Sequence, residues 1–584
     1  MISNKVIGCI FSVLALVLFF SVLVFPNLGL QEKNSTASYK NTVFNEKKVT
    51  RVDLQLDVKD WEDMKANPMN EELKQASVTV NGKSVEGVAV RTKGNSSLMS
   101  VANSDSDRYS LKIDFDYYDS TQSLYGLKKL NLNNNFSDST QMREFVSYEL
   151  MEQMGIPTPS HSYMYVTING EDYGLFLGVE AVDETFLANN YDSNTGFLYK
   201  PDGVGSDLKW ISNQVEDYTG INLKTNEGNS EKSKLIAMLD AINNGGNLEK
   251  YLDVDEMLKY FALNTALVSL DSYQGPMKHN YYLYEEDGVF SIIPWDYNMS
   301  FGGFGGMGGM GRFDDKDGQK VPGGKKGTTD KEKPSKEDEN DMQRGGLDMG
   351  GIAGELMSDS SINFSVVEPV SGTSLEERPL LNALLSNETY NTQYQAILKQ
   401  IATTIFTDKN IESITTDLAA ILTTYVEADP SKFYTTKEFL AGVSGENSLP
   451  EFAKQRSDSI LKQLSGELVA ESQASDGSQE SIQGPDGKNP QVQEGQKGLP
   501  SGFDMDQLPK DFDPSQIPSN FDPSQMMDGP MGGKGGPNGE RSNSEDGTTL
   551  ADHISSPILS AISIGTLMIV LFGVWKFKRR SGFR

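Results

Sequence analysis

The sequence predicts an α+β fold with two lobes, a β-rich N-terminal lobe and a helical C-terminal lobe, flanked by transmembrane helices and disordered segments. From Arg51 to about Phe301, apolar strand patterns and helical stretches alternate with turn residues. From Arg378 to Glu467, apolar residues recur at helical spacing. Each end of the 584-residue chain carries an uncharged apolar segment, and the chain exceeds what one hydrophobic core usually organises.

The apolar segment near the N-terminus, Val6 to Phe25, follows Lys5 and has the length of a membrane-spanning helix. No small-residue cleavage site clearly follows it, so we interpret it as an uncleaved signal anchor; a cleaved signal peptide is the alternative. The second segment, Ile558 to Trp575, precedes a basic cluster at 576–580 that is expected to stay in the cytoplasm. Both termini are therefore predicted to be cytoplasmic, with the main domain outside the membrane.

Changes in composition divide the rest of the chain. Two segments are too polar and too rich in Gly, Pro, Ser and charged residues to bury a core, and we predict them to be disordered. The predicted segments are a cytoplasmic tip and signal anchor at 1–27, a core at 28–301, a Gly/Met-rich and charged insertion at 302–351, a helical lobe at 352–469, a tether at 470–555, a transmembrane helix at 556–577 and a basic cytoplasmic tail at 578–584.

Charge and cysteine content exclude some classes of protein. The chain has 52 basic and 82 acidic residues, a net charge of −30, which argues against binding to DNA or RNA and suits a basic partner. Cys9 is the single cysteine, so no disulfide can stabilise the exported domain.

The most informative stretch is HNYYLYEEDGVFSIIPWDYN, residues 279–298. It predicts a strand from Asn280 to Tyr284, an acidic-Gly turn, and a second strand from Val289 to Pro294, after which Asp296 follows. A hairpin places Asn280 and Asp296 at the same end of two antiparallel strands. Their oxygen atoms are ligands that suit Mg²⁺, so we predict that these two residues hold the metal.

Asp271 lies nine positions before Asn280, after an apolar helical run at 260–270. An aspartate, then an asparagine, then a hairpin ending in another aspartate is the order found in protein kinases, where the first accepts a hydroxyl proton and the others hold magnesium. The spacing is longer than in ordinary kinases, and the last aspartate lies in the sequence WDYN instead of DFG.

These departures point to one family. RTKGNSS at 91–97, YGLFLGVE at 173–180 and the hairpin at 279–298 occur together and in order. With these motifs the chain resembles the CotH kinases, named for a spore coat protein, over roughly Val52 to Leu468. The resemblance implies an atypical protein-kinase-like fold, ATP and Mg²⁺ as cofactors, and transfer of the γ-phosphoryl group to Ser or Thr of envelope or coat proteins.

The same scheme gives upstream residues their expected roles. After a predicted strand at 85–90, a turn formed by Gly94, Asn95, Ser96 and Ser97 would cap phosphates; an ordinary surface turn is the alternative. In the predicted strand from Tyr109 to Asp116, Lys112 points away from the apolar face.

The resemblance implies that Lys112 neutralises the α- and β-phosphates, with Lys93 and Arg91 as competing cations and a solvated strand face as the alternative. A helix predicted at 138–154 offers Glu149 as partner of the strand lysine, with Glu144 in reserve and a surface role as the alternative.

A hairpin predicted around Asn169-Gly170 leads to Glu180 and Asp183. By resemblance it is the hinge between lobes, where backbone amides meet adenine and one of these acids reaches the ribose; simple packing between lobes is the alternative. His161 is expected to be structural, and His279 to orient the active loop or touch phosphate. Neither histidine has the Cys or His neighbours of a zinc site.

Two further functions compete with the kinase. A surface scaffold, adhesin or coat-assembly protein that keeps the fold without turnover fits the predicted extracytoplasmic location, where ATP is scarce. It does not explain convergent magnesium ligands. A hydrolase with paired carboxylates needs a raised pKa on one partner, a property that is not read from sequence, and the sequence lacks the aromatic runs that stack on carbohydrate.

Overall fold

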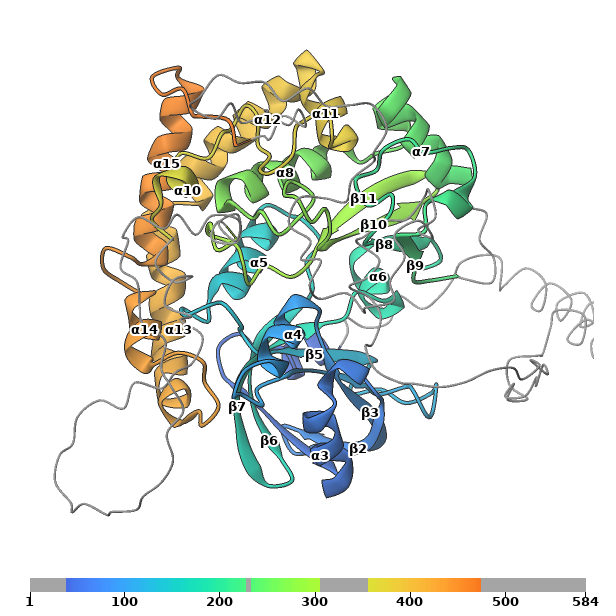
Figure 1. Ribbon diagram of the computed structural model, residues 1–584, viewed down its shortest axis with the longest axis vertical. Coiled ribbons are helices and arrows are strands. Elements are labelled where there is room, and N and C mark those ends of the chain that lie inside the picture. Colours follow the sequence, from blue (N-terminus) through green and yellow to red (C-terminus); the bar gives the residue numbers. More distant parts are fainter. Residues whose placement is uncertain (1–37, 227–232, 305–355, 474–584) are drawn as a thin grey trace, which may run out of the picture. The chain divides into compact units, whose positions relative to one another are not determined.

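The computed structural model describes residues 38–226, 233–304 and 356–473, which belong to one compact unit of the chain (Figure 1). The described region combines a β-rich N-terminal part with helices that follow it, as predicted. None of the helices in these three ranges is long and apolar enough to cross a membrane. The two predicted transmembrane segments, the tether and almost all of the predicted insertion lie outside the described residues.

Seven strands form a closed barrel at the N-terminal end of the described region. Its strands are β1 (Thr50–Leu56), β2 (Lys74–Val80), β3 (Lys83–Lys93), β4 (Ser110–Asp114), β5 (Lys129–Asn133), β6 (His161–Ile168) and β7 (Glu171–Glu180). They follow the order β1-β2-β3-β4-β5-β7-β6, and a parallel pairing of β1 with β6 closes the barrel. Apolar residues that alternate along each strand, such as Leu111 and Ile113, fill the interior, so no open edge is left.

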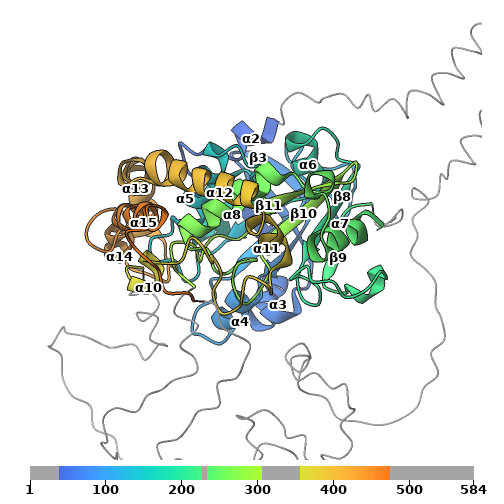
Figure 2. The same cartoon turned by 90° about the horizontal axis from the view of Figure 1, so that it is seen from above.

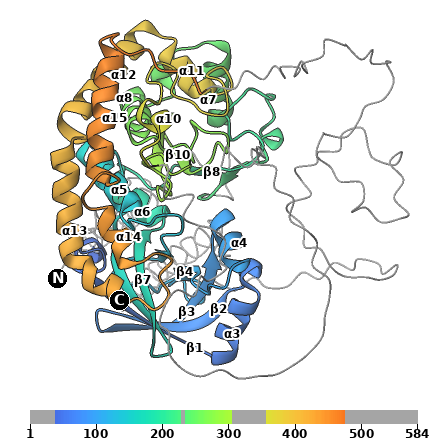
Figure 3. The ribbon, with the colours of Figure 1, turned by 60° about the vertical axis from the view of Figure 1, so that its left-hand side comes forward.

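The predicted hairpin around Asn169-Gly170 joins β6 to β7. Both turn residues have positive φ angles, 52° for Asn169 and 88° for Gly170, as a tight two-residue turn between twisted strands requires. Short helical segments accompany the barrel: α2 (Ser38–Thr42), α3 (Val58–Ala66), η2 (Pro68–Asn70) and α4 (Ser96–Ala102). Figure 3 shows α3 and α4 beside the barrel strands β2 and β3.

A second, four-stranded sheet contains the predicted hairpin at 279–298. Its order is β11-β10-β8-β9, with β8 (Phe197–Pro201), β9 (Ile221–Leu223), β10 (Tyr281–Glu286) and β11 (Val289–Pro294). Tyr281 pairs with Pro294 and Glu286 with Val289. The second strand has the predicted ends, whereas the first begins one residue later and ends two residues later than predicted, so that Glu286 belongs to the strand and the turn is Asp287-Gly288. The turn residues Asp287 and Gly288 again have positive φ angles, 53° and 91°. Asp296 therefore follows β11 at the end where β10 begins.

Helices make up the rest. They are α5 (Arg143–Gln153), α6 (Glu184–Asn190), α7 (Ser233–Asn244), α8 (Val254–Leu267), α10 (Asp359–Ile362), α11 (Pro379–Leu385), α12 (Glu388–Gln400), α13 (Asp408–Ala428), α14 (Thr436–Ala441) and α15 (Leu449–Leu464), with short turns η3 (Val215–Asp217), η5 (Leu248–Lys250) and the π-helical η7 (Ile401–Ile405). Helix α8 is buried on nearly every side, and α12 packs against it (Figures 1 and 2). A helix that is apolar all round belongs in a core, so α8 is a rigid support for the loop that follows it.

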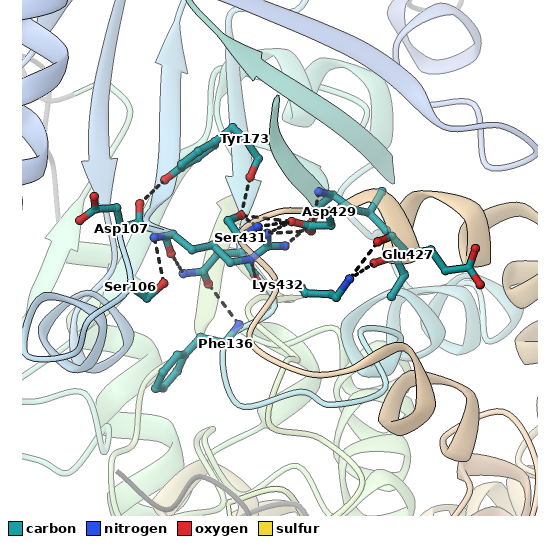
Figure 4. Close-up of polar contacts among 12 residues, drawn as sticks. Ser106, Asp107, Phe136, Tyr173, Glu427, Asp429, Ser431 and Lys432 are labelled. Atoms are coloured by element: carbon teal, nitrogen blue, oxygen red, sulfur yellow. Dashed lines mark hydrogen bonds and ion pairs between the residues drawn. The ribbon is translucent and has the colours of Figure 1, made fainter. Parts of the chain in front are cut away.

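A buried ion pair joins the barrel to the helical region. Nη1 of Arg108, just before β4, lies 2.8 Å from Oδ2 of Asp429, which follows α13, and their side chains are 1% and 0% exposed. The amide of Leu175 in β7 also donates to Asp429 Oδ2 at 2.8 Å. Figure 4 shows Asp429 and Ser431 close to Tyr173, whose carbonyl accepts a hydrogen bond from the Ser431 hydroxyl.

Glycine at position 174 makes this close approach possible. Its φ is +131°, and a Cβ atom there would lie 2.3 Å from Asp429 Oδ1. The ion pair, the Leu175 amide and Gly174 together fix α13 against β7, which sets the position of the helical region relative to the barrel strand.

Candidate functional site

A cavity of about 540 Å³ lies where the ends of the barrel strands β3, β4 and β5 face the second sheet. It has the size of a small-molecule site. It collects every predicted site residue except Glu149 and Glu180. The predicted residues that line it are Arg91, Lys93, Gly94, Asn95, Ser96, Ser97, Lys112, Asp183, Asp271, Asn280 and Asp296.

Asp271 is held in one orientation by its neighbours. Its Oδ1 lies 2.6 Å from His279 Nε2, and the Asn280 side-chain amide donates to its Oδ2 at 3.0 Å and to its backbone oxygen at 2.9 Å. Burial alone would lower the pKa of His279, but the hydrogen bond and charge of Asp271 raise it above the ordinary value. The contact between His279 and Asp271 is consistent with the predicted role of His279 in orienting the loop.

Backbone geometry supports the same loop. Asn280 has a φ of +58°, a left-handed conformation that asparagine tolerates better than most residues. Its amide nitrogen donates to Asp271. Its Oδ1 atom accepts no hydrogen bond from the described residues, so this oxygen is the atom that can bind a cation.

Asp296 faces the same cavity from the end of β11. Its φ is +58°, and its backbone amide donates to the Tyr148 hydroxyl at 3.1 Å. Burial raises the pKa of Asp296; Lys93 lowers it and the charge of Asp271 raises it further. Two carboxylates that repel each other in a buried cavity, beside a free amide oxygen, form a donor set of hard oxygen atoms that fits Mg²⁺.

Lys93, the last residue of β3, is the cation that lowers the pKa of Asp296 most. Its Nζ donates to Asn133 Oδ1 at 2.6 Å, and the Asn133 amide donates to Glu144 Oε2 at 2.9 Å. Burial lowers the pKa of Lys93, and the charges of Asp296 and Glu144 oppose that shift. The predicted competitor Lys93, and not Lys112, therefore lies between the helix glutamate and the aspartate at the end of the hairpin.

Lys112 also lines the cavity, on the neighbouring strand, opposite Arg91 and Asn131. It forms no ion pair with any described residue. Burial lowers its pKa to about 8, and the positive charges of Arg91 and Lys129 add to that effect. Two lysines with different surroundings thus face one cavity, one within a network of acidic groups and one among cations.

The glutamate of α5 that lines the cavity is Glu144. The prediction that Glu149 is the partner of the strand lysine, with Glu144 in reserve, is therefore wrong. Glu149 lies outside the cavity lining, and its Oε1 is 3.5 Å from His161 Nε2. Five positions along a helix rotate a side chain by about 140°, so the two glutamates of α5 cannot share a direction. Burial and then Asp296 raise the pKa of Glu144 to about 7, and the Tyr148 hydroxyl donates to its Oε1 at 3.0 Å.

Glu180 is also absent from the cavity. Its carboxylate is buried and accepts hydrogen bonds from the Tyr39 hydroxyl and from the Ser160 amide, the latter at 3.0 Å. Asp183 does line the cavity, but its Oδ1 caps α6 by accepting from the amides of Thr185 and Phe186 at 2.9 and 3.3 Å. Of the two acids predicted for the hinge, only Asp183 is in a position to meet a ligand.

The turn after β3 forms one wall. Gly94 has a φ of +126°, and a Cβ atom there would lie 2.9 Å from Ser97 Oγ, so the turn needs glycine. Asn95 precedes α4, and Ser96 and Ser97 are its first residues. Arg91 is engaged by an ion pair with Glu71, which limits its use as a ligand for anions.

Three further residues belong to the site and were not predicted: Asn133 and Lys200, which line the cavity, and Tyr148, which contacts Glu144 and Asp296. Asn131 and Asn133 alternate with Leu130 and Leu132, so a search for polar faces of strands would have found Asn133. Tyr148 and Lys200 carry no such signal, because each becomes part of the site only through packing between distant segments.

A family model described as CotH kinase protein matches residues 90–460, well over half of the chain. The chain belongs to the CotH kinase family. The resemblance inferred from the three motifs is thereby confirmed.

Two curated relatives come from Bacillus subtilis (strain 168). Inner spore coat protein H is 27% identical over 188 residues, which cover 30% of this chain and 51% of that protein. Inner spore coat protein H-like protein is 37% identical over 59 residues, which cover 10% of this chain and 19% of that protein. The chain thus matches about half the length of the first relative and less of the second.

The contact between His279 and Asp271 predicts a pH-dependent stability. Because the pKa of His279 is raised in the folded chain, its contribution is fully present below the ordinary imidazole pKa of about 6.5 and is lost as pH rises through the folded pKa. We expect His279→Gln to lower the free energy of unfolding by about 1 kcal/mol at low pH, and by less above neutral pH.

Chemical unfolding at a series of pH values measures this difference. In an Asp271→Asn background this pH-dependent part is expected to shrink, because the partner whose hydrogen bond and charge raise the pKa of His279 most has lost its charge. A difference between wild type and His279→Gln that stays constant across the pH series would contradict the assignment.

Proposed function

We propose that this CotH family member is a protein kinase with an atypical two-lobed kinase-like fold that transfers the γ-phosphoryl group of ATP to Ser or Thr hydroxyls, with Mg²⁺ as cofactor. The observation that carries the proposal is one cavity in which Asp271, Asn280 and Asp296 lie opposite Lys93 and Glu144. Phosphoryl transfer needs positioning and charge neutralisation more than covalent chemistry from the protein, and these side chains are suited to both tasks.

Each side chain has a task in this scheme. Asn280 and Asp296 would hold Mg²⁺, which when bound neutralises charge on the phosphates. Lys93 and Lys112 would pair with phosphate oxygens, and the amides and hydroxyls of the turn at 94–97 would cap them. Glu144 and Asn133 position Lys93 through the hydrogen bonds described above.

Asp271 would orient the attacking hydroxyl. In the transfer, a new P–O bond forms to the Ser or Thr oxygen, the bond between the γ-phosphorus and ADP breaks, and the hydroxyl proton passes to Asp271 and then to solvent. His279 and Asn280 keep the carboxylate in place through contacts to both of its oxygens.

For the substrates we propose basic, Ser-rich proteins of an envelope or a coat. The net charge of −30 favours basic partners, and one relative bears the name inner spore coat protein H. We further propose that residues 6–25 and 558–575 anchor the chain in a membrane, with both termini cytoplasmic and the kinase domain outside.

A phosphoryl-transfer assay tests the proposed activity. The purified chain is incubated with labelled ATP and Mg²⁺, alone or with a basic Ser-rich peptide, and wild type is compared with Asp271→Ala and Asp296→Ala. We expect transfer by wild type only. Equal signal in all three proteins would remove the catalytic assignment, and unchanged thermal stability on addition of ATP and Mg²⁺ would favour a scaffold without turnover.

The two lysines are expected to differ in importance. Lys93→Met should reduce the transfer rate by about 10²- to 10³-fold, because it removes a buried charge placed between Glu144 and Asp296. Lys112→Met makes the same substitution on the neighbouring strand and should cost about tenfold or less. Initial rates of phosphoryl transfer at saturating ATP distinguish the two variants. A larger loss of rate in Lys112→Met than in Lys93→Met would mean that transfer depends mainly on Lys112.

A further inference from the structure

Lys200 lines the cavity from the second sheet, the side that also carries Asn280 and Asp296. It belongs to β8, which runs antiparallel to β10. Lys93 and Lys112, by contrast, lie on the barrel strands β3 and β4. The cavity therefore presents lysines from both of its walls.

Among the described residues, no carboxylate pairs with the ammonium group of Lys200. The Nζ atom lies 5.6 Å from the centroid of the Tyr282 ring, and in the part of the chain that the structure describes it forms no hydrogen bond or ion pair. The side chain is partly buried. A cation–π contact offsets only part of the cost of removing an ammonium group from water. The charge of Lys200 is therefore left for an anionic ligand.

Two lysines act on Asp296 from different parts of the fold. Burial raises the pKa of Asp296, whereas Lys93 and, to a smaller extent, Lys200 lower it. Burial lowers the pKa of Lys200; Lys93 lowers it further, and the charges of Asp296 and Asp202 oppose that shift. The two lysines thus repel each other while both attract Asp296. An anion with more than one charge relieves this repulsion, because it can pair with both ammonium groups.

We propose that Lys200 contacts the phosphates of bound ATP from the wall of the cavity opposite to Lys93. The inference rests on the kinase function proposed above and adds to it a binding residue on the second sheet. Lys200 acts on Asp296, the residue expected to hold Mg²⁺ at the β- and γ-phosphates, so its position suits these phosphates better than the α-phosphate alone. Lys200 thereby makes the site favour ATP over AMP.

A role as a mere counter-ion of Asp296 predicts the opposite effect. Removal of a positive charge beside Asp296 increases the attraction of the cavity for Mg²⁺, so binding of the magnesium nucleotide would be unchanged or tighter. Removal of a lysine that contacts phosphate weakens the nucleotide complex instead. The sign of the change in affinity therefore distinguishes the two roles.

Nucleotide binding to the purified full-length chain tests the role of Lys200. Calorimetry in excess Mg²⁺ compares a non-hydrolysable ATP analogue with AMP, for wild type and for Lys200→Met. We expect the substitution to weaken binding of the analogue by about 10- to 100-fold, the range for loss of a hydrogen bond to a charged group, and binding of AMP by less than about threefold. Retained binding of AMP also shows that the variant is folded.

Two further variants serve as controls. Lys200→Arg keeps the positive charge and should recover most of the affinity for the analogue that Lys200→Met loses. Lys250 lies outside the cavity lining, and its Nζ atom also lies over a tyrosine ring, 4.9 Å from the Tyr251 centroid. Lys250→Met should therefore bind both nucleotides as wild type does.

The inference is overturned if Lys200→Met binds the analogue as tightly as wild type or more tightly, if the analogue and AMP lose affinity by the same factor, or if Lys250→Met loses as much as Lys200→Met. Each of these results, with binding of the analogue by wild type, leaves the proposed kinase function standing. A wild-type chain that binds no analogue contradicts the proposed function and, with it, the role of Lys200.

Discussion

Asp296→Asn is expected to reduce phosphoryl transfer by roughly 10³-fold while leaving the fold intact. The substitution keeps the size of the side chain and suits the left-handed backbone at this position, where φ is +58°. It removes the negative charge that would hold Mg²⁺ opposite Lys93, and electrostatic groups of this kind commonly account for about 10²- to 10³-fold in rate. Initial rates with labelled ATP, together with circular dichroism spectra, measure the effect.

The hairpin provides its own control. Asp287 lies at the tip of the same β10–β11 hairpin, also with a positive φ of 53°, and its side chain is exposed. Asp287→Asn therefore makes the same chemical change at the far end of the hairpin and should retain full activity. Equal loss in both variants would mean that the hairpin tolerates no substitution, and equal activity would mean that Asp296 holds no catalytic metal.

Asp429→Ala is expected to lower the free energy of unfolding by about 3–5 kcal/mol. The substitution leaves the Arg108 guanidinium buried without its counter-ion, and breaking one side of a buried pair usually costs about this much. The amide of Leu175 in β7 loses its acceptor as well. Chemical unfolding monitored by fluorescence measures the change in free energy.

Helix α13 offers a matched control for this change. Asp417 lies in the middle of α13 with an exposed side chain, so Asp417→Ala should change the free energy of unfolding by less than about 0.5 kcal/mol. If Asp429→Ala were as mild as Asp417→Ala, the ion pair would contribute little to holding α13 against β7. A loss of about 3–5 kcal/mol in Asp429→Ala, with little change in Asp417→Ala, would indicate that the contact between the barrel and the helical region depends on this ion pair.

Local signals in the sequence predicted the two hairpins well. Asn169-Gly170 and Asp287-Gly288 each interrupt alternating apolar residues, and both turns have the positive φ angles that such pairs favour. The closed barrel was not predicted. Its closure depends on the parallel pairing of β1 with β6, two strands separated by more than a hundred positions, and no local pattern encodes that contact.

In the candidate site, too, some residues were predicted from the sequence and others were not. Asp271, Asn280 and Asp296 line one cavity, as expected for residues on a hairpin and on the loop leading to it. Glu149 failed as a candidate because periodicity identifies a helix but not which face meets the barrel. Lys93 and Lys112 lie on neighbouring strands, and their neighbours in the sequence do not distinguish them; the fold does, because it brings Asn133 and Glu144 to Lys93.

Binding of ATP to the purified chain, measured by calorimetry with and without Mg²⁺, tests the central claim most directly. The account predicts one nucleotide site per chain, with affinity that falls by at least about tenfold when Mg²⁺ is chelated and that depends on Asp296 in the same way. No detectable binding, or binding that is unaffected both by chelation and by Asp296→Asn, would show that the cavity is not a site for the magnesium nucleotide.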